Sequence, residues 1–184
     1  MTAISIATAN GASGTSSGGA TPIITISFPG ITRPSGDVAI LRDEKTQNTA
    51  GGTFTSGAWQ TRVLQTQPVN VGSHCTLTSN QFVLDAGTYE IFASAPAFQV
   101  LAHQARLQNI TDTATTIIGT GEYAGGSPNL VNTASLVIGE FTIAAQKTFE
   151  LQHRCFATVS TNGFGVQSNV TTEVYSTVFL RKVA

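Results

Sequence analysis

The clearest pattern of apolar and polar positions lies in residues 81–92. Apolar side chains occupy alternate positions on both sides of a central Asp-Ala-Gly: Phe82, Leu84, Tyr89 and Ile91. Because successive side chains of a strand point to opposite faces, this period of two predicts two strands that each bury one face. Gly87 can adopt a positive φ without a Cβ clash, so we expect the two strands to fold back on each other as a hairpin.

The same period recurs after residue 37, and no window shows the sustained 3.6-residue period of a helix. In residues 102–109, His103, Ala105 and Leu107 share one face, and in residues 147–155 Phe149, Leu151, His153 and Cys155 do so. Further strands are predicted at 38–41, 59–66, 115–119, 135–144 and 172–182. We expect loops at 43–57, 123–132 and 160–165. About ten short strands joined by turns favour an all-β sandwich or jelly roll.

Residues 1–36 have a different composition. The first twenty are rich in Gly, Ser, Thr and Ala, and the apolar stretch that follows is bracketed by Pro22 and Pro29. Because proline confines a strand to a sheet edge or an extended segment, we predict an extended N-terminal arm over 1–36, followed by a globular domain over 37–184. The apolar side chains expected to bind neighbouring subunits are Ile23, Ile24, Ile26 and Phe28.

Charged residues make up only 10% of the chain, with nine Lys and Arg against ten Asp and Glu. In an average soluble domain, roughly a quarter of the residues are charged. So weak a basic field argues against a nucleic-acid or anionic-membrane partner, and no apolar run is long enough for a membrane helix. Two interpretations stay open: a Thr/Ser-coated β surface, or a surface covered by neighbouring subunits. The N-terminus lacks the basic region of a secretion signal, so we expect a protein made in a cytoplasm.

Candidate chemistry is sparse. Residues 52–57 have the glycine spacing of a phosphate loop, but Ala58 follows where the motif needs Lys. His74 and Cys75 are adjacent and point to opposite faces of a strand, so a zinc site shared with His153 and Cys155 is not expected. Whether Cys75 and Cys155 pair stays open.

The acidic residues show no pair suited to glycosidase chemistry, and there is no nucleophile elbow. Glu90, Glu140 and Glu150 read as solvent-facing strand positions. The prediction is therefore a protein without catalytic residues, cofactor or metal.

Three aromatic residues are candidates for contacts. Trp59 stands at the start of a predicted strand, where packing is the favoured interpretation. Tyr123 and Phe164 lie in glycine-rich loops and are expected to be exposed. There they would either contact a sugar or a protein, or cap one end of the barrel.

Five stretches in a fixed order carry a family resemblance: Gly51-Gly-Thr-Phe-Thr-Ser-Gly-Ala-Trp-Gln-Thr-Arg62, Phe82-Val-Leu-Asp-Ala-Gly-Thr-Tyr89, His103-Gln-Ala-Arg-Leu-Gln-Asn109, Phe149-Glu-Leu-Gln-His-Arg-Cys155 and Glu173-Val-Tyr-Ser-Thr-Val178. Residues 38–183 resemble C1q/TNF-type jelly rolls, and more closely the C1q-like domains of bacteriophage structural proteins. The resemblance implies a sandwich of about ten antiparallel strands and a compact homotrimer. Residues 1–37 lie outside it and hold no collagen-like repeat, so complement or cytokine function is not implied.

The expected function is that of a bacteriophage virion protein, made in the host cytoplasm and built into the virion. We expect a trimeric capsid decoration (cement) protein that binds the major capsid protein and stabilises the head. The alternative is a receptor-binding tail-fibre tip that contacts host-surface glycan through Tyr123 and Phe164. A minor head-fibre or tail-hub component is the third hypothesis.

Overall fold

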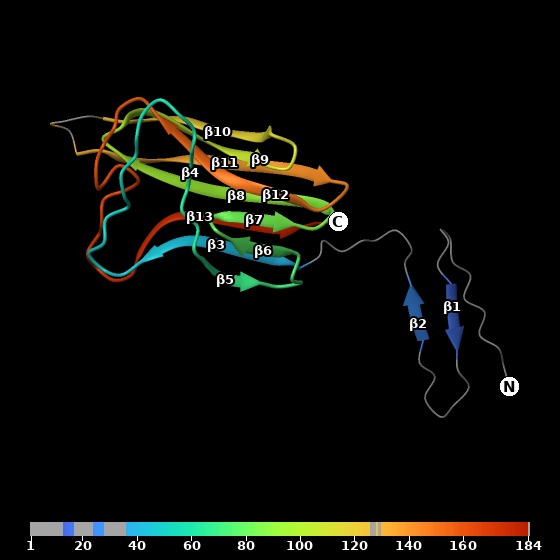
Figure 1. Cartoon of the computed structure of the whole chain (residues 1–184). Helices are drawn as coiled ribbons and strands as arrows, with labels where there is room; N and C mark the ends of the chain where they lie inside the picture. Colours follow the sequence, from blue (N-terminus) through green and yellow to red (C-terminus); the bar gives the residue numbers. More distant parts are fainter. Residues whose placement is uncertain (1–12, 17–23, 28–35, 126–127, 129, 184) are drawn as a thin grey trace. The chain divides into compact units, whose positions relative to one another are not determined.

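A computed structural model of the chain describes residues 13–16, 24–27, 36–125, 128 and 130–183 (Figure 1). The chain divides into two compact units, Met1–Arg33 and Pro34–Ala184. In the first unit, β1 (Ser13–Ser16) pairs antiparallel with β2 (Ile24–Ser27), and Ser13 lies opposite Ser27. The extended-arm role assigned to this part of the chain stays a prediction.

The second unit is built from two antiparallel sheets, and its described residues contain no helix. Its strands are β3 (Val38–Lys45), β4 (Gln60–Thr61), β5 (Thr66–Asn70), β6 (Cys75–Thr78), β7 (Gln81–Leu84), β8 (Gly87–Phe98), β9 (Leu101–Asn109), β10 (Ala114–Ala124), β11 (Asn132–Ile143), β12 (Lys147–Cys155) and β13 (Glu173–Lys182). The six-stranded sheet has the order β10-β9-β12-β7-β6, with β4 paired to β12. The five-stranded sheet has the order β11-β8-β13-β3-β5. The predicted all-β jelly roll is confirmed.

The predicted hairpin over 81–92 is wrong in its pairing. β7 pairs with β6 and β12, whereas β8 pairs with β11 and β13 in the other sheet. The turn at Asp85–Gly87 is therefore a corner between sheets, and Gly87 has a φ of +153° there. The predicted faces are right, because Phe82, Leu84, Tyr89 and Ile91 are all buried. The two strands bury their faces in one core from opposite sheets.

The segment 59–66, predicted as one strand, is interrupted. Only Gln60–Thr61 pairs as β4, and a new strand, β5, begins at Thr66 and continues through Pro68. Pro68 is tolerated because β5 is the edge strand of its sheet, where a missing N–H need not break a ladder. The other predicted strands are present, and β12 has the predicted limits.

The core between the sheets draws its side chains from both. Its largest cluster joins Ala39 and Leu41 of β3 with Phe82 and Leu84 of β7 and with Phe149 of β12. A smaller cluster holds Phe54, Ala97, Val100, Ala124, Cys155 and Phe164. No helix long and apolar enough to cross a membrane occurs in the described part of the chain.

Candidate functional site

A row of apolar side chains crosses the five-stranded sheet. Ile138 of β11 lies opposite Phe92 of β8, and Phe92 lies opposite Phe179 of β13. Phe179 in turn lies opposite Ile40 of β3, which lies opposite Val69 of β5. The chain neighbours of the central members are core residues: Ala39, Leu41, Ile91, Ala93, Val137, Val178 and Leu180. Because side chains alternate along a strand, this apolar row faces away from the core.

Two members of the apolar row are largely open to solvent. The exposed fraction is 46% for Phe92 and 58% for Ile138, although the two are direct cross-strand partners. A depression of about 370 Å³ lies over them and is also lined by Glu90, Glu140 and Phe179. Single exposed apolar side chains are common, but a contiguous group marks an interaction surface.

Polar residues border the apolar row. Glu90 lies opposite both Glu140 and Arg181, and the Arg181 Nε donates a hydrogen bond to the Glu90 carboxylate at 2.9 Å. On the other side Ser94 lies opposite Thr177. An apolar centre with a polar rim is the usual anatomy of a protein–protein interface. The site offers apolar area and shape rather than reactive groups.

The histidines and cysteines considered as metal ligands lie apart from this surface. His153 pairs with His103, with 2.9 Å between His153 Nε2 and His103 Nδ1. Cys75 and Cys155 are both free thiols in the interior. Among the described residues, no group of three or more His, Cys, Asp or Glu side chains is placed to hold a metal ion.

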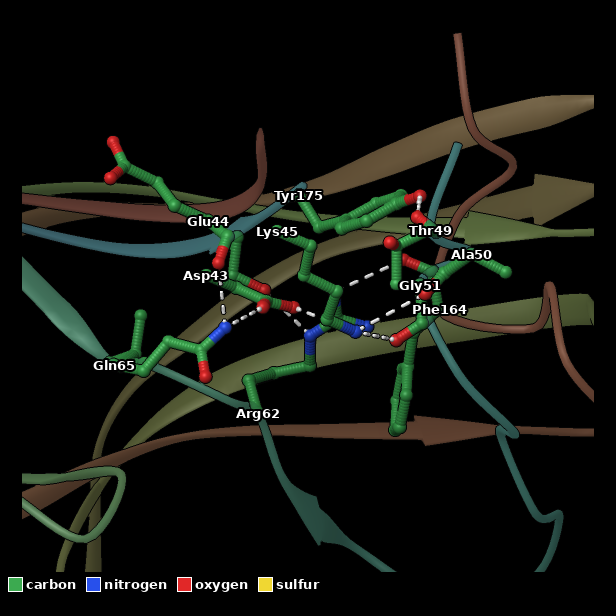
Figure 2. Close-up of polar contacts among 12 residues, drawn as sticks. Asp43, Glu44, Lys45, Thr49, Ala50, Gly51, Arg62, Gln65, Phe164 and Tyr175 are labelled. Carbon is green, nitrogen blue, oxygen red and sulfur yellow. Dashed lines mark hydrogen bonds and ion pairs between the residues drawn. The ribbon is translucent and has the colours of Figure 1, made fainter. Parts of the chain in front are cut away.

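A buried polar cluster lies around Arg62 (Figure 2). Its guanidinium is 1% exposed and donates from Nε to Ser176 Oγ at 2.7 Å and from Nη1 to the Pro96 carbonyl at 3.1 Å. Burial lowers the pKa of Arg62 to about 9, although the nearby Asp43 carboxylate opposes the shift. Burial also raises the pKa of Asp43, against the effect of Lys45 and Arg62. This cluster ties strands of the domain together, and its buried Arg62 and Asp43 are not accessible to a ligand.

The prediction that Phe164 is an exposed loop contact is wrong. Phe164 is 9% exposed, and its ring stacks on Phe54 with 4.4 Å between centroids. The guanidinium of Arg62 covers the ring, so no ligand reaches it. Tyr123, by contrast, is 62% exposed, but it lies within β10 and not in the loop predicted for it. Its contact with a sugar or a protein stays a prediction.

The prediction that Glu150 faces solvent is also wrong. Glu150 is 8% exposed and accepts hydrogen bonds from Thr61 at 2.7 Å, Gln81 at 2.8 Å and Gln152 at 2.6 Å. It is covered because β4 pairs with Gln152 and His153 near the C-terminal end of β12 and brings Thr61 beside it. Burial raises the pKa of Glu150, but the three hydrogen bonds outweigh burial and hold it below its usual value.

The residues predicted to act in the arm are only partly described. Ile24 and Ile26 lie in β2. Ile23 and Phe28 lie outside the described residues. Their contacts with neighbouring subunits stay a prediction.

The apolar row was missed at the sequence level, although the chain carries a signal for it. Its central strands hold adjacent apolar residues, such as Ile91-Phe92, Val137-Ile138 and Val178-Phe179-Leu180. Adjacent apolar residues in a strand make both of its faces apolar. A strict alternation of apolar and polar positions identifies only the inward face.

Comparison with known proteins identifies the fold. No protein-family model matches the chain, and no curated protein sequence does. Murine APRIL at pH 5.0 superposes with a TM-score of 0.51 at 9% identity, over 79% of this chain and 98% of that one. Murine APRIL at pH 8.0 superposes with a TM-score of 0.50 at 10% identity, over the same shares of the two chains. The globular domain of zebrafish complement 1qA superposes with a TM-score of 0.47 at 14% identity, over 83% of this chain and 98% of that one. At such identities the likeness establishes the fold alone, and the globular unit has a C1q/TNF-like jelly-roll fold.

Proposed function

We propose that this chain is a structural protein that works as a homotrimer, in which the apolar row of each copy is covered by the next copy. The observation that carries the proposal is the contiguous exposure of Phe92 and Ile138 within that row. At about 25 cal/mol per Å² of buried apolar surface, covering these side chains in three copies contributes several kcal/mol to assembly.

Copies of this chain are the favoured occupant for two reasons. A rotationally symmetric ring gives every copy the same interface and leaves no row uncovered. The resemblance of residues 38–183 to C1q/TNF domains, which form compact trimers, favours three copies. The chain's low content of charged residues also leaves little electrostatic repulsion between copies.

The finer proposal is a bacteriophage capsid decoration protein, made in the host cytoplasm and bound to the major capsid protein of the virion. Its support is the resemblance to phage C1q-like domains and the N-terminal segment with Ile23, Ile24, Ile26 and Phe28, which has no charged side chain before Arg33. This role is architectural, so we expect no catalytic activity and no cofactor. The receptor-binding tail tip is the competing assignment.

The trimer is tested by light scattering coupled to size-exclusion chromatography. The wild-type chain of 19.1 kDa is expected to elute with about three times that mass. Phe92→Asp should shift the population to single chains, because it places a carboxylate in the middle of the apolar row. Phe156→Asp is the matched control, since Phe156 is 80% exposed and directly follows β12 of the other sheet. A stable single wild-type chain at micromolar concentration would contradict the proposal.

The virion role is tested on phage particles. A decoration protein is expected in hundreds of copies per virion and a tail tip in a handful, which a calibrated stained gel separates. Deletion of residues 1–30 should lower the occupancy of the protein on capsids. Undiminished occupancy by the truncated trimer would refute the arm contact and leave the test of the trimer unaffected.

A further inference from the structure

A second depression, of about 550 Å³, lies on the six-stranded sheet. We call it the aromatic cleft. Its principal lining residues are Trp59, Ala102, Gln104, Gly121, Arg154 and Phe156. None of them belongs to the apolar row.

The strand register explains why the surface is hollow here. Gln104 of β9 lies between Gly121 of β10 and Arg154 of β12. Two residues further along both strands, at the end of this pairing, the Phe156 N–H donates a hydrogen bond to the Ala102 carbonyl at 2.9 Å. A Cβ added at Gly121 would meet no atom within 4 Å. The cleft thus has a floor of small residues, Ala102 and Gly121, between larger side chains.

Two aromatic side chains border this floor. Phe156 is 80% exposed. The Arg106 guanidinium lies 4.2 Å from the centre of the Trp59 ring and is itself held by hydrogen bonds to Gln152 Oε1 at 2.8 and 3.0 Å. The Trp59 ring is therefore held in place before any ligand binds, which lowers the entropic cost of stacking on it.

The polar groups of the cleft include both donors and acceptors. Arg154 supplies a guanidinium on the face that it shares with Gln104, whereas Glu122 lies at the rim of the cleft, opposite the inward-facing His103. Within the described residues Arg154 makes no hydrogen bond or ion pair, whereas the charge of Glu122 acts on the buried His103. The Gln104 side-chain amide donates to the Gly119 carbonyl at 2.9 Å, which leaves its oxygen as an acceptor. This combination suits hydroxyl groups, since each hydroxyl both donates and accepts.

We propose that the aromatic cleft binds a neutral saccharide, with the C–H face of a sugar ring on Phe156 or Trp59 and its hydroxyls on Arg154 and Gln104. The negative charge of Glu122 at the rim of the cleft disfavours an anionic ligand, so a neutral sugar fits better. Most small-molecule sites are concave and apolar with a few convergent polar groups, as here. The cleft contains no residue of the apolar row, so the sugar test and the trimer test can fail separately.

The first experiment applies the full-length labelled protein to an array of neutral and acidic oligosaccharides. The neutral oligosaccharide with the strongest signal is then titrated while the fluorescence of Trp59, the only tryptophan, is recorded. We expect saturable binding to neutral sugars with a change in emission from Trp59. Binding to acidic sugars alone, or to none, overturns the proposal.

Variants locate the bound sugar. Gly121→Leu should abolish binding, because a Cβ is accommodated there with no atom within 4 Å and the rest of the leucine side chain would occupy the floor. Phe156→Ala and Arg154→Gln should each weaken binding by about tenfold. Val71→Ala is the matched control, since Val71 is 54% exposed outside the cleft, and should bind as the wild type does. Circular dichroism checks that each variant is folded. Wild-type binding by a folded Gly121→Leu variant would refute the site.

Discussion

The guanidinium of Arg62 lies 4.1 Å from the centre of the Phe164 ring and donates a hydrogen bond from Nη2 to the Phe164 carbonyl at 3.1 Å (Figure 2). The two residues are 102 positions apart in the chain. Arg62 follows β4, and Phe164 lies in the long segment between β12 and β13. A buried charge therefore holds this segment against the sheets and removes Phe164 from the surface.

Replacement of Arg62 should destabilise the domain strongly. Arg62→Met leaves Ser176 and the carbonyls of Pro96 and Phe164 without their charged donor, so we expect the free energy of unfolding to fall by about 3 kcal/mol or more. Urea denaturation at fixed protein concentration measures this change in the free energy of unfolding. Arg154→Met, at an exposed arginine without such bonds, should change stability by about 0.5 kcal/mol or less. Equal effects of the two substitutions would show that the Arg62 cluster contributes nothing.

Glu150 and Glu140 provide a matched pair of strand glutamates. Glu150→Ala should lower the free energy of unfolding by about 1–3 kcal/mol, because it leaves the partly buried donors of Thr61, Gln81 and Gln152 without their buried acceptor. Glu140 is exposed, so Glu140→Ala should have little effect. Chemical denaturation of both variants distinguishes them, and a neutral Glu150→Ala would mean that water replaces the carboxylate at no cost.

Stability should fall on mild acidification because of the paired histidines. Burial lowers the pKa of His103 to about 4, and burial together with Arg62 and His103 lowers the pKa of His153 well below its usual value. The unfolded chain takes up protons first as the pH falls below about 6.5, so the stability is present above that value and is lost toward about 4. The loss approaches about 1.4 kcal/mol per pH unit for each histidine that stays neutral. Urea denaturation between about pH 7 and about pH 5 measures the slope. His103→Gln should flatten it, whereas an unchanged slope would assign the effect to other groups.

The two thiols should be inert in the folded protein. Burial raises the pKa of Cys75 to about 12 and that of Cys155 to about 11, so the reactive thiolate is scarce at neutral pH. An aromatic disulfide reagent should titrate almost no thiol under native conditions and both thiols in denaturant without reductant. Absence of reaction in denaturant would mean that Cys75 and Cys155 are oxidised.

Strand faces could be predicted because they depend on local sequence. The alternation at Phe82, Leu84, Tyr89 and Ile91 identifies core positions whichever strands lie alongside. Strand partners could not be predicted in the same way. Residues 81–92 look like a hairpin locally, but the strands that hydrogen-bond to β8 come from 132–143 and 173–182.

The two candidate surfaces likewise consist of residues that the sequence shows to be apolar and of neighbour relations that only the fold decides. Phe92 and Ile138 are apolar in any structure, but only strand pairing places them side by side. The aromatic cleft likewise combines Trp59, Gly121 and Phe156 from segments far apart in the sequence.

By itself the sequence determined an all-β domain, the inward faces of its main strands and a surface poor in charge, because each follows from composition or from a period of two. Tertiary structure alone decided that 81–84 and 87–98 enter different sheets, that Arg62 buries Phe164, and that Thr61 helps to cover Glu150. The physical reason is that β pairing and burial depend on which distant segments meet, and no local pattern specifies those partners.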